Sequence, residues 1–461
     1  MPHHHAIGLN RRELLQVGYS GLMGMGLASI LGGLSRAGSS VPASRVKSVV
    51  LIFQTGAPSH LDTFDLKPEA PVEVRGSFAG TETKVPGIRF SEHLPLLAAR
   101  ADKLAIVRSM THGLPSHEHA THMMLAGIDR MPPGASHMAS RSDWPCYASG
   151  VDFVRPRSDG VPNGVMLPTY LNNGYGFSGQ SAGILGPKFD PWQIRRDPNE
   201  PGFRVEEVTL PPGLDAEAVG RRKGLLAEVD RQVAAIDRAG AGGGFSAIQD
   251  KAFTMLTSGR VKRAFDIEKE DPRTRDRYGR HMFGQSLLLA RRLVQAGVPM
   301  IQANMGHMNN WDTHTDNCNQ LKDRLLPPLD RGVSAFLDDH ETFGLLDSTL
   351  VIMVGEFGRT PKIGQSSVND PKQKTGRDHW AGVFSAMFAG GGVRGGQVIG
   401  KSDKMGAYPA TRGYYPSDLG ATIYQALGID PGSEVTDRLG RPLALNRGEP
   451  IAPLFDGSLG A

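Results

Sequence analysis

The sequence is poor in cysteine and carries little net charge, and each shortage excludes a class of protein. Its two cysteines, Cys146 and Cys318, cannot build a disulfide framework or a cysteine-rich zinc knuckle. A formal net charge of +4 over 461 residues, without a long basic run, gives nucleic-acid binding no electrostatic support. Glycine and proline are plentiful but follow no period, which excludes a collagen-like chain. Because 39% of the residues are hydrophobic, a globular protein with a sizeable core is expected.

The N-terminal segment has the features of an export signal. Arg11 and Arg12 precede a glycine-rich apolar stretch, residues 17–34, and the small residues Ser35 and Ala37 stand at positions −3 and −1 of a possible cut after Ala37. Paired arginines, a mildly apolar stretch and small residues before a cleavage site are typical of a twin-arginine signal. We therefore expect residues 1–37 to direct the protein to the periplasm or cell envelope, with membrane contact only through this segment. The apolar stretch is close to membrane-spanning length, so a retained anchor is the alternative.

Short apolar runs alternate with helical patterns along the rest of the chain. The runs are typical of buried strands, and the patterns between them are typical of amphipathic helices. This alternation predicts an α/β fold with a mostly parallel sheet covered by helices on both faces. We expect a single domain over residues 45–457, with a helical insert near residues 205–295. The predicted strands are 46–53, 298–303, 349–354 and 383–389, and the predicted helices are 215–238, 283–296 (ending at Gly297), 317–339 (kinked or split at Pro327-Pro328) and 418–428.

The turns at the ends of these predicted strands carry histidines and carboxylates. In open α/β sheets, ligands bind at the carboxyl ends of the strands, so a site is expected there. Asp312 and His314 are spaced so that, in an extended loop, both side chains point the same way and could hold one cation. Glu356 and His379 are the natural remaining ligands for zinc, which binds nitrogen and oxygen and keeps a position open when it is catalytic. A lone loop histidine is more often a surface or hydrogen-bonded residue, but here several turns share these residue types.

A second histidine cluster lies between His112 and His122. Ser116 is suited to cap the helix that begins there, which is a purely structural explanation. The same helix N-terminus would also offer free N–H groups to a phosphate or sulfate, with Ser116 or His117 well placed as a nucleophile. His119 and His122 share one helical face, whereas His117 points toward the start of the helix.

Two arginines stand in the same turns as the candidate ligands. Arg359 follows the third predicted strand, and Arg377 precedes the fourth. A guanidinium group binds tetrahedral oxyanions through a planar fork of donors, so both arginines are candidate substrate-binding residues. Surface arginines are common, and that is the alternative for each.

A known family shares several segments with this chain: residues 61–68, 284–297, 311–314, 355–361 and 376–380. Through these motifs the sequence resembles the twin-arginine-exported bacterial proteins called domain of unknown function 1501, in the alkaline phosphatase/sulfatase superfamily. The resemblance implies an alkaline-phosphatase-like three-layer α/β/α sandwich with a mostly parallel sheet. It also implies one or two divalent metals and a nucleophile at a helix N-terminus.

The chain departs from the pattern of the superfamily in four places. Asp312 and His314 resemble its Asp/His pair but are two residues apart instead of four. Residues 54–55 are Gln-Thr where a metal-binding aspartate is expected, and Asp62 or His60 would be the substitute a few residues later. Residues 356–357 are Glu-Phe where Asp-His is expected, so one carboxylate is kept and one histidine is lost. There is no Cys-x-Pro-Ser-Arg motif, so the standard sulfatase mechanism is not expected.

These features predict an exported, metal-dependent hydrolase of phosphate or sulfate esters. The divalent metal is expected to be zinc, with manganese, calcium or magnesium as alternatives, and the candidate catalytic residues are Ser116, His117 and His119. The expected partner is a small anionic ester, or a sulfated or phosphorylated glycan. The alternative is a catalytically inactive sulfatase-like protein that binds a glycan or serves in the cell envelope.

Overall fold

A computed structural model describes residues 45–132, 134, 136–205, 259–306, 310–366, 374–437 and 440–455. The predicted signal, residues 1–37, and the predicted helix 215–238 lie outside the described residues. The chain divides after Ala43, so that Ser44–Ala461 forms one compact unit. No helix in the described ranges is both long enough and apolar enough to cross a membrane.

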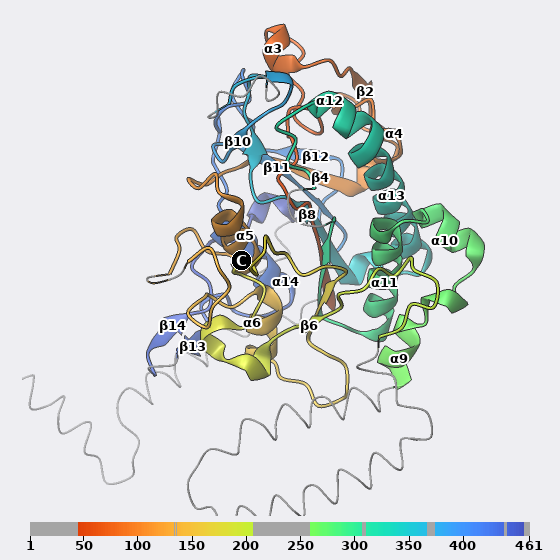
Figure 1. Ribbon diagram of the computed structural model, residues 1–461, viewed down its shortest axis with the longest axis vertical. Coiled ribbons are helices and arrows are strands. Elements are labelled where there is room, and N and C mark those ends of the chain that lie inside the picture. The colour runs from red at the N-terminus through yellow and green to blue at the C-terminus, as the bar shows by residue number, and fades with distance from the viewer. Residues whose placement is uncertain are drawn as a thin grey trace, which may run out of the picture. The chain divides into compact units, whose positions relative to one another are not determined.

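An eight-stranded sheet forms the centre of this unit (Figure 1). Every neighbouring pair of strands is parallel except the two pairs that β11 makes. The order across the sheet is β12 (Gln397–Ile399), β4 (Leu104–Met110), β11 (Phe384–Ala389), β8 (Thr349–Val354), β1 (Ser48–Phe53), β7 (Met300–Asn304), β5 (Gly164–Leu167) and β6 (Trp192–Gln193).

The central strand β1 explains why the sheet is covered on both faces. All its residues are buried, and side chains alternate between the two faces of a strand. Val50 and Ile52 join one hydrophobic core, whereas Val49, Leu51 and Phe53 join the other. A continuous apolar run is therefore required here, and that run is what the sequence shows.

Helices cover both faces of the sheet, as Figure 1 shows. Helices α11 (Met282–Ala296) and α13 (Leu326–Thr342) contribute to the core that holds Ile52. Helices α5 (His117–Ala126), α6 (Tyr147–Val154) and α14 (Pro416–Ala426) contribute to the other core. The predicted three-layer α/β/α sandwich is therefore confirmed. The other helices in the described ranges are α3 (Val72–Arg75), α4 (Pro95–Ala98), α9 (Gly259–Phe265), α10 (Pro272–Tyr278) and α12 (Asn317–Asn319), with short 3₁₀ turns at 101–103, 183–185, 187–189, 267–269, 346–348 and 452–454.

Two helix ends follow directly from the sequence. Helix α11 stops at Gly297, whose φ of 86° is the left-handed conformation that glycine adopts readily. The predicted helix 317–339 is divided, because α12 passes into a π-helix over Gln320–Leu325 before α13 begins. Residues 327–328 are therefore prolines in the first turn of α13, where a missing N–H costs nothing.

Strand β11 corrects one prediction, because residues 383–389 were expected to be a parallel strand. It runs antiparallel to both β4 and β8. A parallel strand needs a crossover that returns the chain to the opposite edge, usually a helix. The described residues between β8 and β11 contain no α-helix, so the chain turns back at the edge where β8 ends. This reversal places the residues before β11 at that same edge.

Three two-stranded ribbons complete the fold of the described residues. In the ribbon nearest the sheet, β9 (Gly358–Arg359) pairs with β10 (His379–Trp380), and His379 lies opposite Arg359. The other two ribbons join β2 (Gly80–Glu82) to β3 (Arg89–Ser91) and β13 (Glu434–Thr436) to β14 (Pro442–Ala444).

Candidate metal centre

The turns that follow β4, β7 and β8, and the ribbon that precedes β11, meet at one edge of the sheet. The turn after β4 leads into α5, whose first residue is His117. The turn after β7 carries Asp312 and His314, the turn after β8 carries Glu356, and the ribbon carries His379. The parallel strands and the reversed β11 together explain why these distant segments converge.

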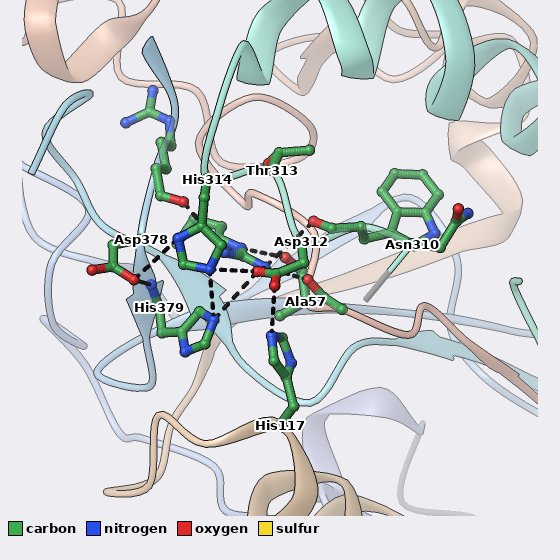
Figure 2. Close-up of polar contacts among 12 residues, drawn as sticks. Ala57, His117, Asn310, Asp312, Thr313, His314, Asp378 and His379 are labelled. Atoms are coloured by element: carbon green, nitrogen blue, oxygen red, sulfur yellow. Dashed lines mark hydrogen bonds and ion pairs between the residues drawn. The ribbon is translucent and has the colours of Figure 1, made fainter. Parts of the chain in front are cut away.

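Three histidines surround the carboxylate of Asp312 (Figure 2). Its Oδ1 lies 2.9 Å from His314 Nε2 and 3.2 Å from His379 Nε2. Its Oδ2 lies 3.3 Å from His117 Nε2. The two nitrogens His314 Nε2 and His379 Nε2 are themselves 3.0 Å apart. The structure thus brings together the three residues that the sequence grouped, Asp312, His314 and His379, and adds His117 to them.

The spacing of these atoms fits a cation better than it fits a hydrogen-bonded network. Ligand atoms on a tetrahedral zinc ion lie roughly 3.3 Å from one another. Two imidazole nitrogens 3.0 Å apart can share only one proton, and the buried His117 Nε2 makes no hydrogen bond. Two overlapping groups could hold a metal ion among the described residues: His117 with Asp312 and His379, and His314 with Asp378 and His379.

The charges around Asp312 favour its ionised form. Burial would raise the pKa of this carboxyl, but the close contacts with the three histidines and the charge of Arg359 outweigh burial and hold the pKa well below its usual range. Burial likewise opposes the charged form of His117, but the carboxylates of Asp312 and Glu356 raise its pKa to about 9. Without a metal ion, the His117 imidazolium therefore balances these carboxylates.

Glu356 supports His117 instead of joining the cluster. Its Oε1 accepts hydrogen bonds from His117 Nδ1 at 2.6 Å and from the Gly56 amide at 2.8 Å. This contact turns the other nitrogen of His117 toward Asp312. His112 Nε2 lies 2.6 Å from the Glu356 carbonyl oxygen and fixes the turn from the other side. The sequence predicted Glu356 as a ligand, whereas the structure directs its Oε1 to His117 and to the Gly56 amide.

Arg359 holds the opposite side of the Asp312 carboxylate. It is fully buried and donates to Asp312, to the Gly56 carbonyl and to the Ala57 carbonyl, the last at 2.8 Å. Gly56 and Ala57 have positive φ angles of 101° and 61°, which turn both carbonyls toward the guanidinium. Arg359 thus orients Asp312, which differs from the expected contact with a substrate anion.

Arg377, Asp62 and His60 lie apart from the cluster, contrary to their predicted roles. The five N–H groups of Arg377 are directed to both carboxylate oxygens of Asp62 and to the carbonyls of Val74, Thr360 and Pro361. No donor is left for a substrate. Asp62 is fully buried in this ion pair, and His60 is buried with its Nε2 2.9 Å from the Gly406 carbonyl. Neither Asp62 nor His60 replaces the aspartate that residues 54–55 lack.

Ser116 occupies the N-cap position of α5, but its hydroxyl does not cap the helix. The Oγ atom donates to Glu118 Oε2 at 3.1 Å and lies 3.0 Å from His119 Nδ1. The Pro115 carbonyl accepts a hydrogen bond from His379 Nδ1 at 2.9 Å, which places the start of α5 against the cluster. Because both nitrogens of His117 face carboxylates, Ser116 is the better placed of the two candidate nucleophiles.

Sequence reasoning gave no role to His112 or Asp378. Asp378 Oδ1 lies 3.3 Å from His314 Nδ1, so this carboxylate braces the far side of a cluster histidine. Its position directly before His379 was the available signal, whereas nothing local marks His112. His122 is a structural residue, because its Nε2 lies 3.1 Å from the Trp144 amide nitrogen.

Comparison with known proteins gives one match along the sequence and several in structure. Residues 46–455 match the family described as "Protein of unknown function (DUF1501)". No curated protein matches the sequence.

Several solved structures resemble the fold at low sequence identity. PsFucS1 sulfatase from Pseudoalteromonas sp. is 13% identical with a TM-score of 0.37, covering 87% of this chain and 70% of that chain. The lipoteichoic acid synthase LtaP from Listeria monocytogenes is 10% identical with a TM-score of 0.36, covering 90% and 80%. The TAB5 alkaline phosphatase with Mg bound is 11% identical with a TM-score of 0.35, covering 84% and 100%. Sequence identities and TM-scores this low say nothing about the reaction of this chain.

Proposed function

Since this chain belongs to the DUF1501 family, as its motifs predicted, we propose that it is a divalent-metal-dependent hydrolase of phosphate or sulfate esters. One observation carries the proposal: the Nε2 atoms of His117, His314 and His379 each lie 2.9–3.3 Å from an oxygen of the Asp312 carboxylate at one edge of the sheet. The substrate class is a small anionic ester, including sulfated or phosphorylated glycans.

The donor set favours zinc among divalent metals. Three imidazole nitrogens and one carboxylate are zinc ligands by type, whereas magnesium and calcium prefer oxygen. A bound divalent ion would supply Lewis acidity toward an ester oxygen. Glu356 and Arg359 would keep His117 and Asp312 oriented for that ion, as outer-shell groups do.

The start of α5 would hold and attack the ester. The first amides of a helix have no partner within the helix and favour anions, so they would bind the phosphoryl or sulfuryl oxygens. The Ser116 hydroxyl would attack phosphorus or sulfur, and the bond to the alcohol oxygen would break as that oxygen takes up a proton. Water would then hydrolyse the ester formed on Ser116. When the hydroxyl turns from Glu118 Oε2 to His119 Nδ1, which lies 3.0 Å from the Ser116 oxygen, His119 would accept the proton and could pass it to the leaving alcohol.

Metal analysis and aryl-ester turnover test this proposal together. We expect stoichiometric zinc in the purified protein, with an anomalous diffraction peak at the cluster. We expect hydrolysis of aryl phosphates or sulfates that Asp312→Ala and Ser116→Ala both abolish, while only Asp312→Ala also loses the zinc. Protein that holds no divalent metal and hydrolyses no ester with any added metal would leave the non-catalytic alternative.

We also propose that the chain is exported through the twin-arginine pathway. The support is the Arg11-Arg12 pair and the apolar stretch that follows it. Replacing both arginines by lysine should keep the protein in the cytoplasm, as measured by cell fractionation. Continued export of that variant would contradict the proposal.

A further inference from the structure

A cavity of about 490 Å³ lies beside the first turn of α5. Cavities of this size hold small ligands. Only the short turn at residues 115–116 separates it from the metal cluster. On one side of this turn the Pro115 carbonyl accepts a hydrogen bond from His379 Nδ1, and on the other Ser116 Oγ lies 3.0 Å from His119 Nδ1. The residues that line the cavity are Gly113, Leu114, His119, Asp129, Arg130 and Met131.

Arg130 is the group in this cavity that would recognise a charge. Its side chain is exposed, and its guanidinium makes no ion pair or hydrogen bond within the described part of the chain. The carboxylate of Asp129 is already engaged, because it accepts the Ser417 amide at 2.9 Å and the Ser417 hydroxyl at 2.6 Å. An unpaired guanidinium binds carboxylate, sulfate or phosphate through two parallel hydrogen bonds.

The rest of the cavity is suited to an apolar body. Leu114 is 37% exposed, and the half-buried Met131 lies on the wall beside Arg130. His119 lies between this surface and the Ser116 hydroxyl. A ligand in the cavity would therefore contact both His119, the neighbour of the Ser116 hydroxyl, and Arg130.

We infer that this cavity binds the alcohol part of the ester, and that this alcohol carries a second anionic group held by Arg130. That the bound alcohol is part of an ester substrate rests on the proposed function, whereas the binding of an anionic alcohol does not. The two claims can therefore fail separately.

Binding of two alcohols tests the cavity without any turnover. The probes are 4-hydroxybenzoate and p-cresol, which are both phenols; the first carries a carboxylate at the position where the second carries a methyl group. Titration calorimetry on the full chain should show 4-hydroxybenzoate binding roughly tenfold more tightly than p-cresol, since a charge-assisted hydrogen bond contributes about that much. Arg130→Ala should remove the preference. Arg273→Ala should keep it, because Arg273 is also an exposed arginine but lies on α10.

Turnover of the matching esters gives the second readout. With 4-carboxyphenyl and 4-methylphenyl phosphates or sulfates, Arg130→Ala should lower kcat/KM roughly tenfold for the carboxylated ester only. Hydrolysis of both esters with no effect of Arg130→Ala overturns the subsite and leaves the proposed function. Arg130-dependent binding of 4-hydroxybenzoate without any hydrolysis supports the subsite and overturns the hydrolase. Equal binding of both alcohols to the wild-type protein overturns the subsite.

Discussion

Replacing Glu356 by glutamine tests whether an outer carboxylate holds a metal ligand in place. Glu356 is fully buried and accepts hydrogen bonds from His117 Nδ1 at 2.6 Å and the Gly56 amide at 2.8 Å. Glutamine keeps the size and one oxygen but loses the charge. Carboxylates that orient a ligating histidine typically contribute 10–100-fold to metal affinity, so Glu356→Gln should weaken zinc binding by about 1.4–2.8 kcal/mol.

The assay is zinc titration against a competing chelator, with urea unfolding of the metal-free protein alongside it. Asp339→Asn is the matched control, because Asp339 is equally buried but accepts from Tyr278 Oη at 2.9 Å in the helical layer. Asp339 also forms an ion pair with the buried Arg291, so Asp339→Asn should lose about 3–5 kcal/mol of unfolding free energy, as a broken buried ion pair does, and keep its zinc affinity. Unchanged zinc affinity in Glu356→Gln, or an equal loss in Asp339→Asn, would refute the reasoning.

Three further predictions address the loop, the metal and acid stability. Gly376→Ala would place its Cβ 2.0 Å from the His314 carbonyl and displace that loop, so chelator competition should show zinc binding weakened roughly tenfold or more. In the control Gly113→Ala the new Cβ meets open space, and zinc affinity should not change. Zinc at about 100 times its dissociation constant should raise the unfolding free energy by about 2.7 kcal/mol, measured by urea unfolding, and an equal rise in Asp312→Ala would contradict the site. Burial lowers the pKa of His340 from 6.5 to about 4, so on acidification the unfolded chain takes up this proton before the folded chain does. The free energy of unfolding is therefore unaffected above pH 6.5 and falls by roughly 3 kcal/mol toward pH 4. His340→Leu should flatten that fall in urea unfolding at pH 7 and pH 4.5, and an unchanged slope would exclude this residue as its cause.

The parts of the fold that depend on continuous apolar runs could be predicted from the sequence. Strands β1, β7 and β8 are buried on both faces, so their runs are uninterrupted. Strand β4 was missed because Arg108 and Ser109 interrupt its pattern, and β6 was missed because it has two residues. The direction of β11 could not be predicted, since it depends on how the chain returns and not on the composition of the strand.

The candidate site was predictable where strand order alone decides the position. Asp312, His314 and His379 flank strands that end or begin at one edge, so they converge whatever their rotamers. The orientation of His117 depends on how α5 approaches the turn after β8, which no local spacing encodes. The pairing of Asp62 with Arg377 spans 315 residues and was equally invisible.

The dispersal of the cluster along the chain determines when an ion can enter it. His117 and Glu356 are 239 residues apart and meet only through the assembled sheet. An unfolded chain therefore presents scattered donors of low affinity, and selective loading has to wait for tertiary structure. The proposed twin-arginine export would carry the chain across the membrane already folded, so the ion would then be acquired from the pool inside the cell.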